Sequence, residues 1–289
     1  MVSEIERAVA RHTGSSFVNR DSALLGGGCI NQASSITGEC GRKYFLKKNA
    51  PSFLPFFQAE AQALEEIKAT QTINTPEVIG HGTEDGQAFL ILEFIAEGSS
   101  NPQSQSTLGR LLARMHKMTQ TYFGWSVDNC IGATPQPNPR SQEWPTFYRD
   151  HRLAHQLTLA QRKGKSFDGA DELLRMIPEF FSDYSPQPSL LHGDLWGGNA
   201  SCDLEGTPFI FDPASYYGDR EADLAFTYMF GGFSSAFYQA YEKEFPVDKG
   251  FQVRKTLYNL YHELNHYNLF GGGYASSAQS SIRSLLNHR

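Results

Sequence analysis

The chain has 289 residues, a length that allows one large domain or two lobes with separate cores. Hydrophobic residues make up 40% and charged residues 19%, which excludes a largely disordered chain. The formal net charge of −6 argues against nucleic acid as the main partner. Apolar runs such as 89–92 are too short to span a bilayer, and the first residues lack an apolar signal core. We therefore expect a cytoplasmic protein without a membrane partner.

The four cysteines are scattered along the chain and form no CxxC pair; they are Cys29, Cys40, Cys130 and Cys202. This spacing argues against both a disulfide framework and a structural zinc site.

The first hundred residues predict a mostly β segment that carries one helix. A helix is expected over 53–67, because apolar residues recur there at helical spacing. Short apolar runs bounded by turn residues predict strands at 17–25, 33–37, 44–47, 76–79 and 88–94.

Beyond a polar, breaker-rich linker at 97–102, helical periodicity dominates. Helices are expected at 108–115 and 142–162, on either side of a proline-rich loop at 135–139, and several more follow residue 219. An aspartate-rich stretch at 168–171 is a candidate cap for a further helix, and short strands are expected at 189–191 and 208–211. We predict an α+β, bilobal fold. Residues 1–96 would form a β-rich nucleotide-binding lobe, and residues 97–289 a mostly helical catalytic and substrate-binding lobe.

Two aspartates and an asparagine have a spacing that phosphoryl transfer uses. Asp194 follows a short apolar strand and lies in a glycine-containing loop, Asn199 comes five residues later, and Asp212 follows the next strand. The first aspartate can accept a proton from a substrate hydroxyl, and the other two side chains can hold magnesium against nucleotide phosphates. Each residue alone could be a turn or cap residue, but together they indicate a kinase.

A lysine and a glutamate upstream complete this pattern. Lys47 ends an expected strand and could bind the α- and β-phosphates, and Glu60 lies in the following helix, where it could hold Lys47 by an ion pair. Lys48 is the competing lysine, and Glu65 and Glu66 are the competing carboxylates. A solvated lysine and a surface glutamate are the structural alternative.

A glycine run lies between the first two expected strands. The backbone amides of Gly27 and Gly28, with nearby Asn31, could approach phosphate oxygens, although the sequence is not a P-loop and also suits a plain hairpin turn. Cys29 would lie next to those amides, so its pKa could be lowered and the thiol could be redox-sensitive.

Four further residues are candidates for ligand contacts by their place in the chain. The backbone of Glu93, Phe94 and Ile95 comes where the two lobes would meet and could hydrogen-bond an adenine edge. Trp196 could stack on a sugar face or pack beneath its loop.

Polar residues on one expected helix face are a weaker signal. His262, Asn265 and His266 share that face, but no acidic residue completes a zinc motif, so a core role or a substrate contact is favoured. Asp223 is expected to cap a helix that begins near Leu224 or to brace the catalytic loop.

The chain resembles the fructosamine kinase (ketosamine-3-kinase) family, which belongs to the protein-kinase-like and aminoglycoside-phosphotransferase-like superfamily. The HGD-to-Asn core indicates the superfamily, and the Leu-Trp-Gly-Gly insert with the late Leu-Asn-His segment narrows it to this family. The matching stretches are 27–31, 45–47, 60–61, 192–199, 211–214, 219–225 and 264–271.

This resemblance implies an enzyme that uses ATP and Mg²⁺ to phosphorylate the O3 hydroxyl of ribulosamines or fructosamines. The 3-phosphate makes the adduct unstable and restores the amine, which is a deglycation step in protein repair. It also implies that Asp194 is the base, that Asn199 and Asp212 bind the metal, and that Lys47 with Glu60 anchors the phosphates. Family members with a cysteine in the glycine loop form redox-controlled dimers, so Cys29 implies a monomer or a redox-dependent homodimer.

Two alternatives remain at this point. The first is another small-molecule kinase that acts on an aminoglycoside, choline or a free sugar. The second is a nucleotide-binding pseudokinase that serves as a scaffold. The complete set of Lys47, Asp194, Asn199 and Asp212 argues against the scaffold, which has no chemical need for all four residues.

Overall fold

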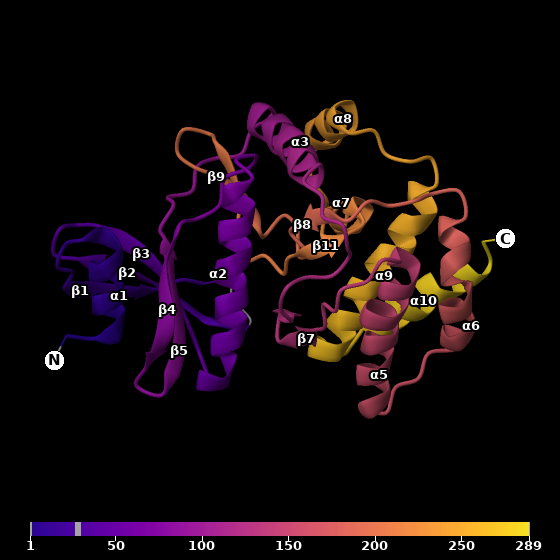
Figure 1. Cartoon of the computed structure of the whole chain (residues 1–289), viewed down its shortest axis with the longest axis horizontal. Helices are drawn as coiled ribbons and strands as arrows, with labels where there is room; N and C mark the ends of the chain where they lie inside the picture. The colour runs from indigo at the N-terminus through magenta and orange to yellow at the C-terminus, as the bar shows by residue number, and fades with distance from the viewer. Residues whose placement is uncertain (1, 27–29, 289) are drawn as a thin grey trace. The chain divides into compact units, whose positions relative to one another are not determined.

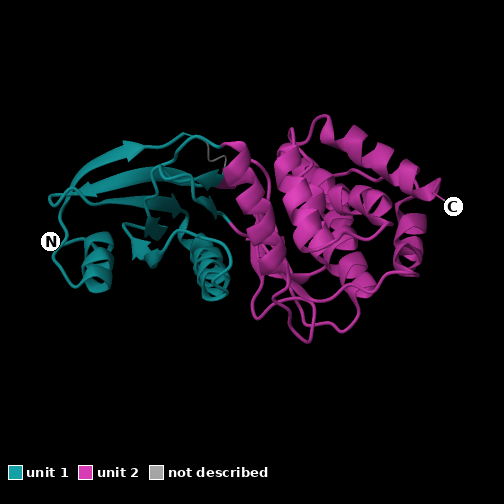
Figure 2. Ribbon diagram, turned by 90° about the horizontal axis from the view of Figure 1, so that it is seen from above, with its two compact units in different colours: residues 1–100, 201–212 teal, residues 101–200, 213–289 magenta. Residues whose placement is uncertain are grey.

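The computed structural model describes residues 2–26 and 30–288 (Figure 1). The chain forms two compact units, and each is built from two stretches of sequence (Figure 2). The first unit comprises residues 1–100 and 201–212, and the second comprises 101–200 and 213–289. The lobe boundary between residues 96 and 97 stays a prediction.

A five-stranded sheet is the centre of the first unit. Its strand order is β1-β2-β3-β5-β4, and every neighbouring pair is antiparallel. The mostly β character predicted for the first hundred residues is therefore confirmed. The strands are β1 (Asn19–Leu24), β2 (Gln32–Gly38), β3 (Lys43–Asn49), β4 (Val78–Glu84) and β5 (Gln87–Glu93).

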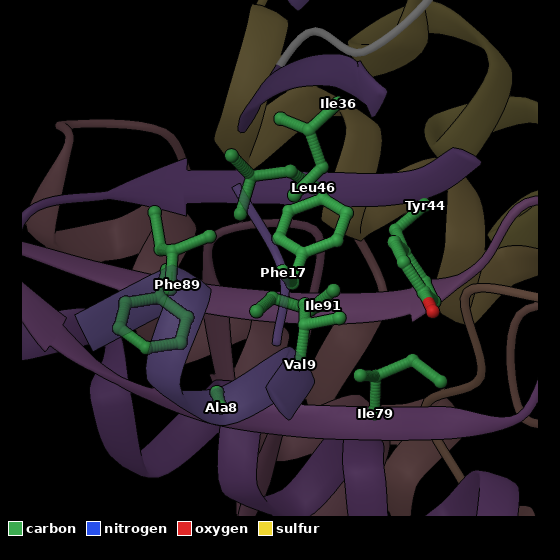
Figure 3. Close-up of a cluster of buried hydrophobic side chains, with 10 residues drawn as sticks. Ala8, Val9, Phe17, Ile36, Tyr44, Leu46, Ile79, Phe89 and Ile91 are labelled. Carbon is green, nitrogen blue, oxygen red and sulfur yellow. The ribbon is translucent and has the colours of Figure 1, made fainter. Parts of the chain in front are cut away.

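Helices cover both faces of this sheet. Successive residues of β5 point to opposite faces, and each face packs against a different helix. Phe89 and Ile91 pack with α1 (Glu4–Thr13) in the core cluster of Figure 3. Ala88, Leu90 and Leu92 pack instead with the long helix α2 (Leu54–Ala69), which follows a short 3₁₀ turn, η1 (Pro51–Phe53). A strand that is buried on both faces has a continuous apolar sequence, as 88–92 does.

Helix α1 was not predicted from the sequence. Only one helix, over 53–67, was expected in the first hundred residues. It begins with a capping box in which the Ser3 side chain accepts from Glu6 N and the Glu6 carboxylate accepts from Ser3 N. Its buried residues, Ile5, Ala8 and Val9, recur at helical spacing. Both patterns are visible in the sequence and would have revealed the helix.

The first unit is completed by the later segment 201–212. Phe209 forms a parallel bridge with Asn74, and Ile210 N donates to Asn74 O at 3.0 Å. Gly98 N donates to Cys202 O at 2.8 Å. Cys202 and Phe209 lie in a two-stranded sheet of β9 (Ala200–Cys202) and β10 (Pro208–Ile210), so these contacts join that sheet to the earlier part of the unit. The segment ends at Asp212.

The second unit is mostly helical, with short strand pairs between the helices. The helix expected over 142–162 is broken into α4, a π-helical turn and α5. The stretch 168–171 does not provide a side-chain cap, since α6 begins after Gly169 without one. The elements are α3 (Pro102–His116), β6 (Asn129–Ile131), β7 (Thr134–Gln136), α4 (Trp144–Tyr148), η2 (Arg149–Leu153), α5 (Ala154–Arg162), α6 (Ala170–Met176), η3 (Ile177–Phe181), β8 (Ser189–Leu191), β11 (Tyr216–Gly218), α7 (Arg220–Phe226), α8 (Ser235–Glu244), α9 (Phe251–Phe270) and α10 (Tyr274–Leu286).

Aromatic side chains and one close backbone approach define the core of this unit. Trp144 is 1% exposed, and its indole N–H donates to Tyr258 Oη at 2.9 Å, so that the polar atom of each buried ring has a partner. On α3, a Cβ at Gly109 would lie 2.1 Å from the carbonyl oxygen of Phe237 on α8. Only glycine allows these two helices to pack at this distance.

Candidate active site

Lys47 lies between two carboxylates in the first unit. Its Nζ is 2.6 Å from Glu60 Oε1 and 2.6 Å from Asp212 Oδ1. Strand alternation puts Lys47 on the sheet face that α2 covers, and α2 supplies Glu60. The Lys47 side chain is 5% exposed and that of Glu60 is 12% exposed, whereas that of Asp212 is 43% exposed. The cluster therefore has a buried end and an open end.

The charges of this cluster do not balance, since one ammonium faces two carboxylates. Burial alone would lower the pKa of Lys47, but the charges of Asp212 and Glu60 outweigh burial and raise this pKa above its ordinary value. Burial raises the pKa of Glu60 to about 7, although the Lys47 charge opposes this rise. Lys47 is thus firmly protonated, and Glu60 can take up a proton near neutral pH.

The competing lysine faces a different partner. Lys48 is next to Lys47 on β3, so its side chain leaves the opposite face of the sheet, where its Nζ is 3.9 Å from Glu84 Oε2. The sequence offered Lys47 or Lys48 as the lysine and Glu60, Glu65 or Glu66 as the carboxylate. The structure pairs Lys47 with Glu60.

Asp212 has an unusual backbone conformation. Its φ is +58°, in the left-handed region that residues other than glycine occupy at a cost of roughly 1 kcal/mol. It comes two residues after β10, whose last residue, Ile210, is fully buried. The backbone turn therefore begins from a fixed strand end and leaves the carboxylate partly exposed beside Lys47.

The loop after β8 in the second unit carries Asp194 and Asn199. Asn199 Nδ2 donates to the backbone oxygen of Asp194 at 2.8 Å and to its carboxylate Oδ2 at 3.2 Å. Asn199 N donates to Trp196 O at 2.9 Å, which closes the turn. Asn199 is 7% exposed and Asp194 is half-buried. Because the Asn199 amide nitrogen bonds inside the loop, its amide oxygen is the atom left to accept a ligand.

Glycine is required at residue 193. Gly193 has φ +83°, and a Cβ there would lie 2.1 Å from the backbone oxygen of Ala214. Ala214 N in turn donates to His192 O at 2.9 Å. The residue before Asp194 is therefore fixed by both its backbone angle and its close contact with the backbone at Ala214, in the segment before β11.

A buried carboxylate from α7 braces this loop. Asp223 Oδ2 accepts from His192 N at 2.6 Å, and its Oδ1 accepts from Gly193 N at 2.8 Å. His116 Nε2 is 3.2 Å from the same carboxylate, and His116 Nδ1 is 2.7 Å from Tyr241 Oη. Asp223 thus braces the loop, which was one of its two expected roles.

The other expected role of Asp223, helix capping, is wrong. Helix α7 begins at Arg220 rather than near Leu224, and the side chain of Asp219 caps it by accepting from Glu221 N at 3.0 Å.

An aromatic chain begins at Trp196, in the same loop as Asp194. The Trp196 ring is 5.5 Å from Phe230, edge to face, and Phe230 is 5.3 Å from His266 on α9. The indole also covers Gly198, where a Cβ would come within 2.4 Å of the ring. The structure therefore brings together two candidate substrate residues, Trp196 and His266, through a third residue that the sequence analysis missed. Its only signal was a Phe-Gly-Gly turn at 230–232.

The other polar residues on the same face of α9 are deeply buried. His262 is 4% exposed and stacks on Phe226 at 3.5 Å, and Asn265 is 2% exposed. Burial lowers the pKa of His262 well below its usual range and also lowers the pKa of His266. Both imidazoles are therefore neutral at pH 7.

Part of the predicted glycine loop, namely Gly27, Gly28 and Cys29, lies outside the described residues. Asn31, which follows, accepts at Oδ1 from Asn49 Nδ2 at 2.7 Å. Asn49 ends β3, so this bond ties the start of β2 to the end of the strand that carries Lys47.

The segment predicted to meet the adenine follows the end of β5. Glu93 is the last residue of that strand, and its N–H donates to Glu77 O at 2.8 Å within the first unit. Phe94 and Ile95 lie beyond the strand and are half-buried. The Glu93 N–H is thus engaged inside the sheet.

The available donors suit a hard cation that arrives with its ligand. Among the residues that the structure describes, no group of three or more His, Cys, Asp or Glu side chains could hold a metal ion. Asn199 and Asp212 offer an amide oxygen and a carboxylate, and Mg²⁺ is commonly held by one or two such groups together with substrate phosphates and water. By donor type alone, the Asn199 amide oxygen in the second unit and the Asp212 carboxylate in the first are groups that magnesium accepts.

No helix in the described part of the chain is long and apolar enough to cross a membrane.

Comparisons with known proteins agree along the whole chain. The family model described as fructosamine kinase matches residues 1–288. A probable ketoamine kinase from Synechocystis is 45% identical, and the match covers 98% of this chain and 96% of that protein. The chloroplastic protein-ribulosamine 3-kinase of Arabidopsis thaliana is 44% identical over 91% of this chain and 81% of its own length.

Solved structures show the same fold. A candidate fructosamine-3-kinase from Haemophilus somnus superposes with a TM-score of 0.92 and is 31% identical, covering 98% of this chain and 97% of that one. A choline kinase from Streptococcus pneumoniae superposes with a TM-score of 0.61 over 99% of this chain and all of that one, at 15% identity. The second likeness shows the fold alone, that of the protein-kinase-like phosphotransferases, and the predicted α+β fold class is confirmed.

Proposed function

Because the chain belongs to the fructosamine kinase family, we propose that it transfers the γ-phosphoryl group of ATP to the O3 hydroxyl of a ketosamine. The acceptor would be a ribulosamine or fructosamine formed on a free amine, a peptide or a protein. The product 3-phosphate would release the sugar and restore the amine, so the reaction would serve protein deglycation.

The observation that carries this proposal is the family match over residues 1–288. Relatives described as a probable ketoamine kinase and as a protein-ribulosamine 3-kinase support the acceptor class. The fold alone would also suit choline or aminoglycoside phosphorylation, so the acceptor is assigned from the family and not from the fold.

In the first unit, we assign nucleotide contacts to Lys47 and its neighbours. The Lys47 ammonium would bind α- and β-phosphate oxygens, and Glu60 would keep it in place through the 2.6 Å ion pair. The backbone after β5, at Glu93 to Ile95, would meet the adenine edge, and the glycine loop with Asn31 would lie along the phosphates.

In the second unit, we assign the acceptor hydroxyl to Asp194. Its carboxylate would orient the O3 hydroxyl and accept its proton as the phosphorus–oxygen bond forms. Asn199 holds both the backbone and the carboxylate of Asp194, so the base is oriented before substrate binds. Trp196 and His266 would contact the sugar.

Asn199 and Asp212 are the residues that would hold magnesium. The ion would neutralise phosphate charge that develops during transfer. Asp212 already contacts Lys47 by an ion pair, so this carboxylate has a charged partner before any nucleotide binds.

An acceptor survey of wild-type enzyme tests the proposal. With ATP and Mg²⁺, we expect turnover of ribulose-, erythrulose- or fructose-lysine and a product phosphate at O3 by NMR. Choline, an aminoglycoside and free fructose are the comparison acceptors. Preferential turnover of any of these three, with none of the ketosamines, would overturn the proposed acceptor.

The role of Asp194 is tested by substitution. We expect Asp194→Ala to lower kcat by roughly 100- to 10,000-fold, the usual contribution of a positioned base, while ATP still binds. Asp183→Ala is the matched control, since Asp183 is an exposed aspartate of the same unit. Near-normal turnover of Asp194→Ala would show that another group is the base.

A further inference from the structure

Phe230 is an exposed aromatic residue in a conformation that costs free energy. It is 50% exposed, and its φ is +54°, a left-handed angle that bulky residues rarely adopt. Two glycines, Gly231 and Gly232, follow it with φ +98° and +72°. Backbone strain at an exposed, large side chain has no benefit for folding, so it points to a role in binding.

The surrounding turn holds Phe230 in this position. Tyr238 Oη donates to Thr227 O at 3.1 Å and accepts from Phe233 N at 3.1 Å, so one side chain of α8 clamps both sides of the turn. Gly232 N donates to Met229 O at 3.2 Å across it. The exposed ring is therefore presented by a fixed turn.

The ring lies beside the loop that carries Asp194. Trp196 is two residues after Asp194, and its ring is 5.5 Å from Phe230; His266 is 5.3 Å from Phe230 on the other side. Phe226 contacts the same ring from α7 at 6.1 Å. Phe230 is thus an exposed member of an aromatic surface that starts at the candidate acceptor site.

The electrostatics of this surface favour a cation. In the described part of the chain, no Lys or Arg side chain lies over the rings of Phe230 or Trp196, whereas Lys255 lies 4.7 Å from the centre of the nearby Tyr228 ring. Burial lowers the pKa of His266, so the imidazole carries no charge at neutral pH. No side-chain cation in the described part of the chain therefore competes with a ligand cation for these two rings.

We propose that Phe230 is a specificity-determining residue that receives the protonated secondary amine of the acceptor on its ring face. This inference rests on the proposed function, because a ketosamine differs from a free ketose by this alkylammonium group beside the sugar. With O3 at Asp194 and the sugar at Trp196, Phe230 is the next aromatic ring along the surface. The enzyme would then select ketosamines over free ketoses partly through a cation–π contact.

A pair of acceptors that differ in the charge of one nitrogen tests the proposal. The first acceptor is an N-alkyl ketosamine, and the second is its N-acetyl derivative, in which the amide nitrogen carries no charge. We expect Phe230→Leu to lower kcat/KM for the charged acceptor by about 2- to 30-fold, mainly through KM, because a cation–π contact is worth about that factor. The value for the acetylated acceptor should change less than twofold.

Two further variants separate this role from general packing. Phe230→Tyr keeps an aromatic face and should therefore retain the wild-type preference for the charged acceptor. Phe270→Leu is the matched control, since Phe270 is 53% exposed and also contacts His266, at 5.8 Å, but belongs to the end of α9. It should leave the ratio of the two kcat/KM values unchanged.

The outcomes distinguish the two proposals. If wild-type enzyme turns over neither acceptor, the proposed function fails. If wild-type enzyme prefers the charged acceptor and Phe230→Leu keeps this preference, the role of Phe230 is overturned while the function stands. An equal loss for both acceptors would assign Phe230 to sugar contact or loop structure and would also overturn the ammonium contact.

Discussion

At the scale of single residues, the burial of Glu60 beside Lys47 makes folding stability depend on pH. Burial raises the pKa of Glu60 to about 7, whereas its ordinary value is 4.5. The folded chain therefore binds a proton at Glu60 that the unfolded chain releases, throughout the range between these two values. Folding stability must then rise as pH falls from about 7 toward 4.5.

Glu60→Gln removes this titration and is the variant of choice. We expect the unfolding free energy of the wild type, relative to Glu60→Gln, to increase by about 1.4 kcal/mol for each pH unit below 7. Urea unfolding at pH 8.0, 6.5 and 5.5 measures the difference, and other titrating groups cancel because both proteins carry them. A difference that is constant, or that shrinks toward acid pH, would contradict the raised pKa.

One ion pair of the candidate site could be predicted from the sequence, whereas one exposed residue could not. Lys47 and Glu60 were found by their order along the chain, and the structure forms that ion pair. Phe230 was missed, because its exposure and left-handed φ depend on Tyr238 of α8, and no pattern near residue 230 reports on that contact.

At the scale of elements, α7 links the core of the second unit to the Asp194 loop. Asp223 accepts both N–H groups at His192 and Gly193, and it is 2% exposed. Buried backbone donors that lose their acceptor cost about 1–3 kcal/mol each. The brace therefore contributes both to stability and to the position of the loop that carries Asp194.

Asp223→Asn tests this brace with little change in volume. The amide nitrogen would face one of the two donors, so we expect a loss of about 1–3 kcal/mol in unfolding free energy and a fall in kcat of more than about tenfold, with KM for ATP little changed. Tyr241→Phe is the graded comparison, because it removes the hydroxyl that contacts His116 and Arg220 but leaves the Asp223 carboxylate in place, and its effects on kcat should be smaller. A fully active, destabilised Asp223→Asn would limit the residue to folding.

Element prediction succeeded where apolar residues form a run or recur at helical spacing. Helix α2 and the strands of the first sheet were all expected, although β1 is exposed along its whole length and has no apolar pattern. Of the three-residue strands, β8 and β10 were expected from their apolar residues, whereas β6, β7, β9 and β11 were not. Helix α1 was missed for a different reason, since its capping box was present in the sequence and went unused.

At the scale of the whole molecule, nucleotide and metal should stabilise the folded chain. A ligand that binds only the native state at 100 times its Kd adds about 2.7 kcal/mol to the unfolding free energy. For a chain of this size we expect ATP with Mg²⁺ to raise Tm by several degrees, since about 2–4 °C accompanies each kcal/mol.

The metal requirement is tested by the same measurement. ATP with EDTA should give a smaller rise in Tm than ATP with Mg²⁺, and Asp212→Asn should reduce the difference between the two conditions. Equal shifts with and without magnesium in the wild type would contradict the assignment of Asn199 and Asp212 to the ion.

The two-segment construction of the first unit limits how this protein can be dissected. A polypeptide that stops at residue 100 would lack the partner of Asn74 at Phe209 and one of the two carboxylates beside Lys47, both of which are encoded more than a hundred codons downstream. The first unit is therefore not a portable module, because its gene segment cannot be separated from the segment that encodes the second unit without losing residues 201–212.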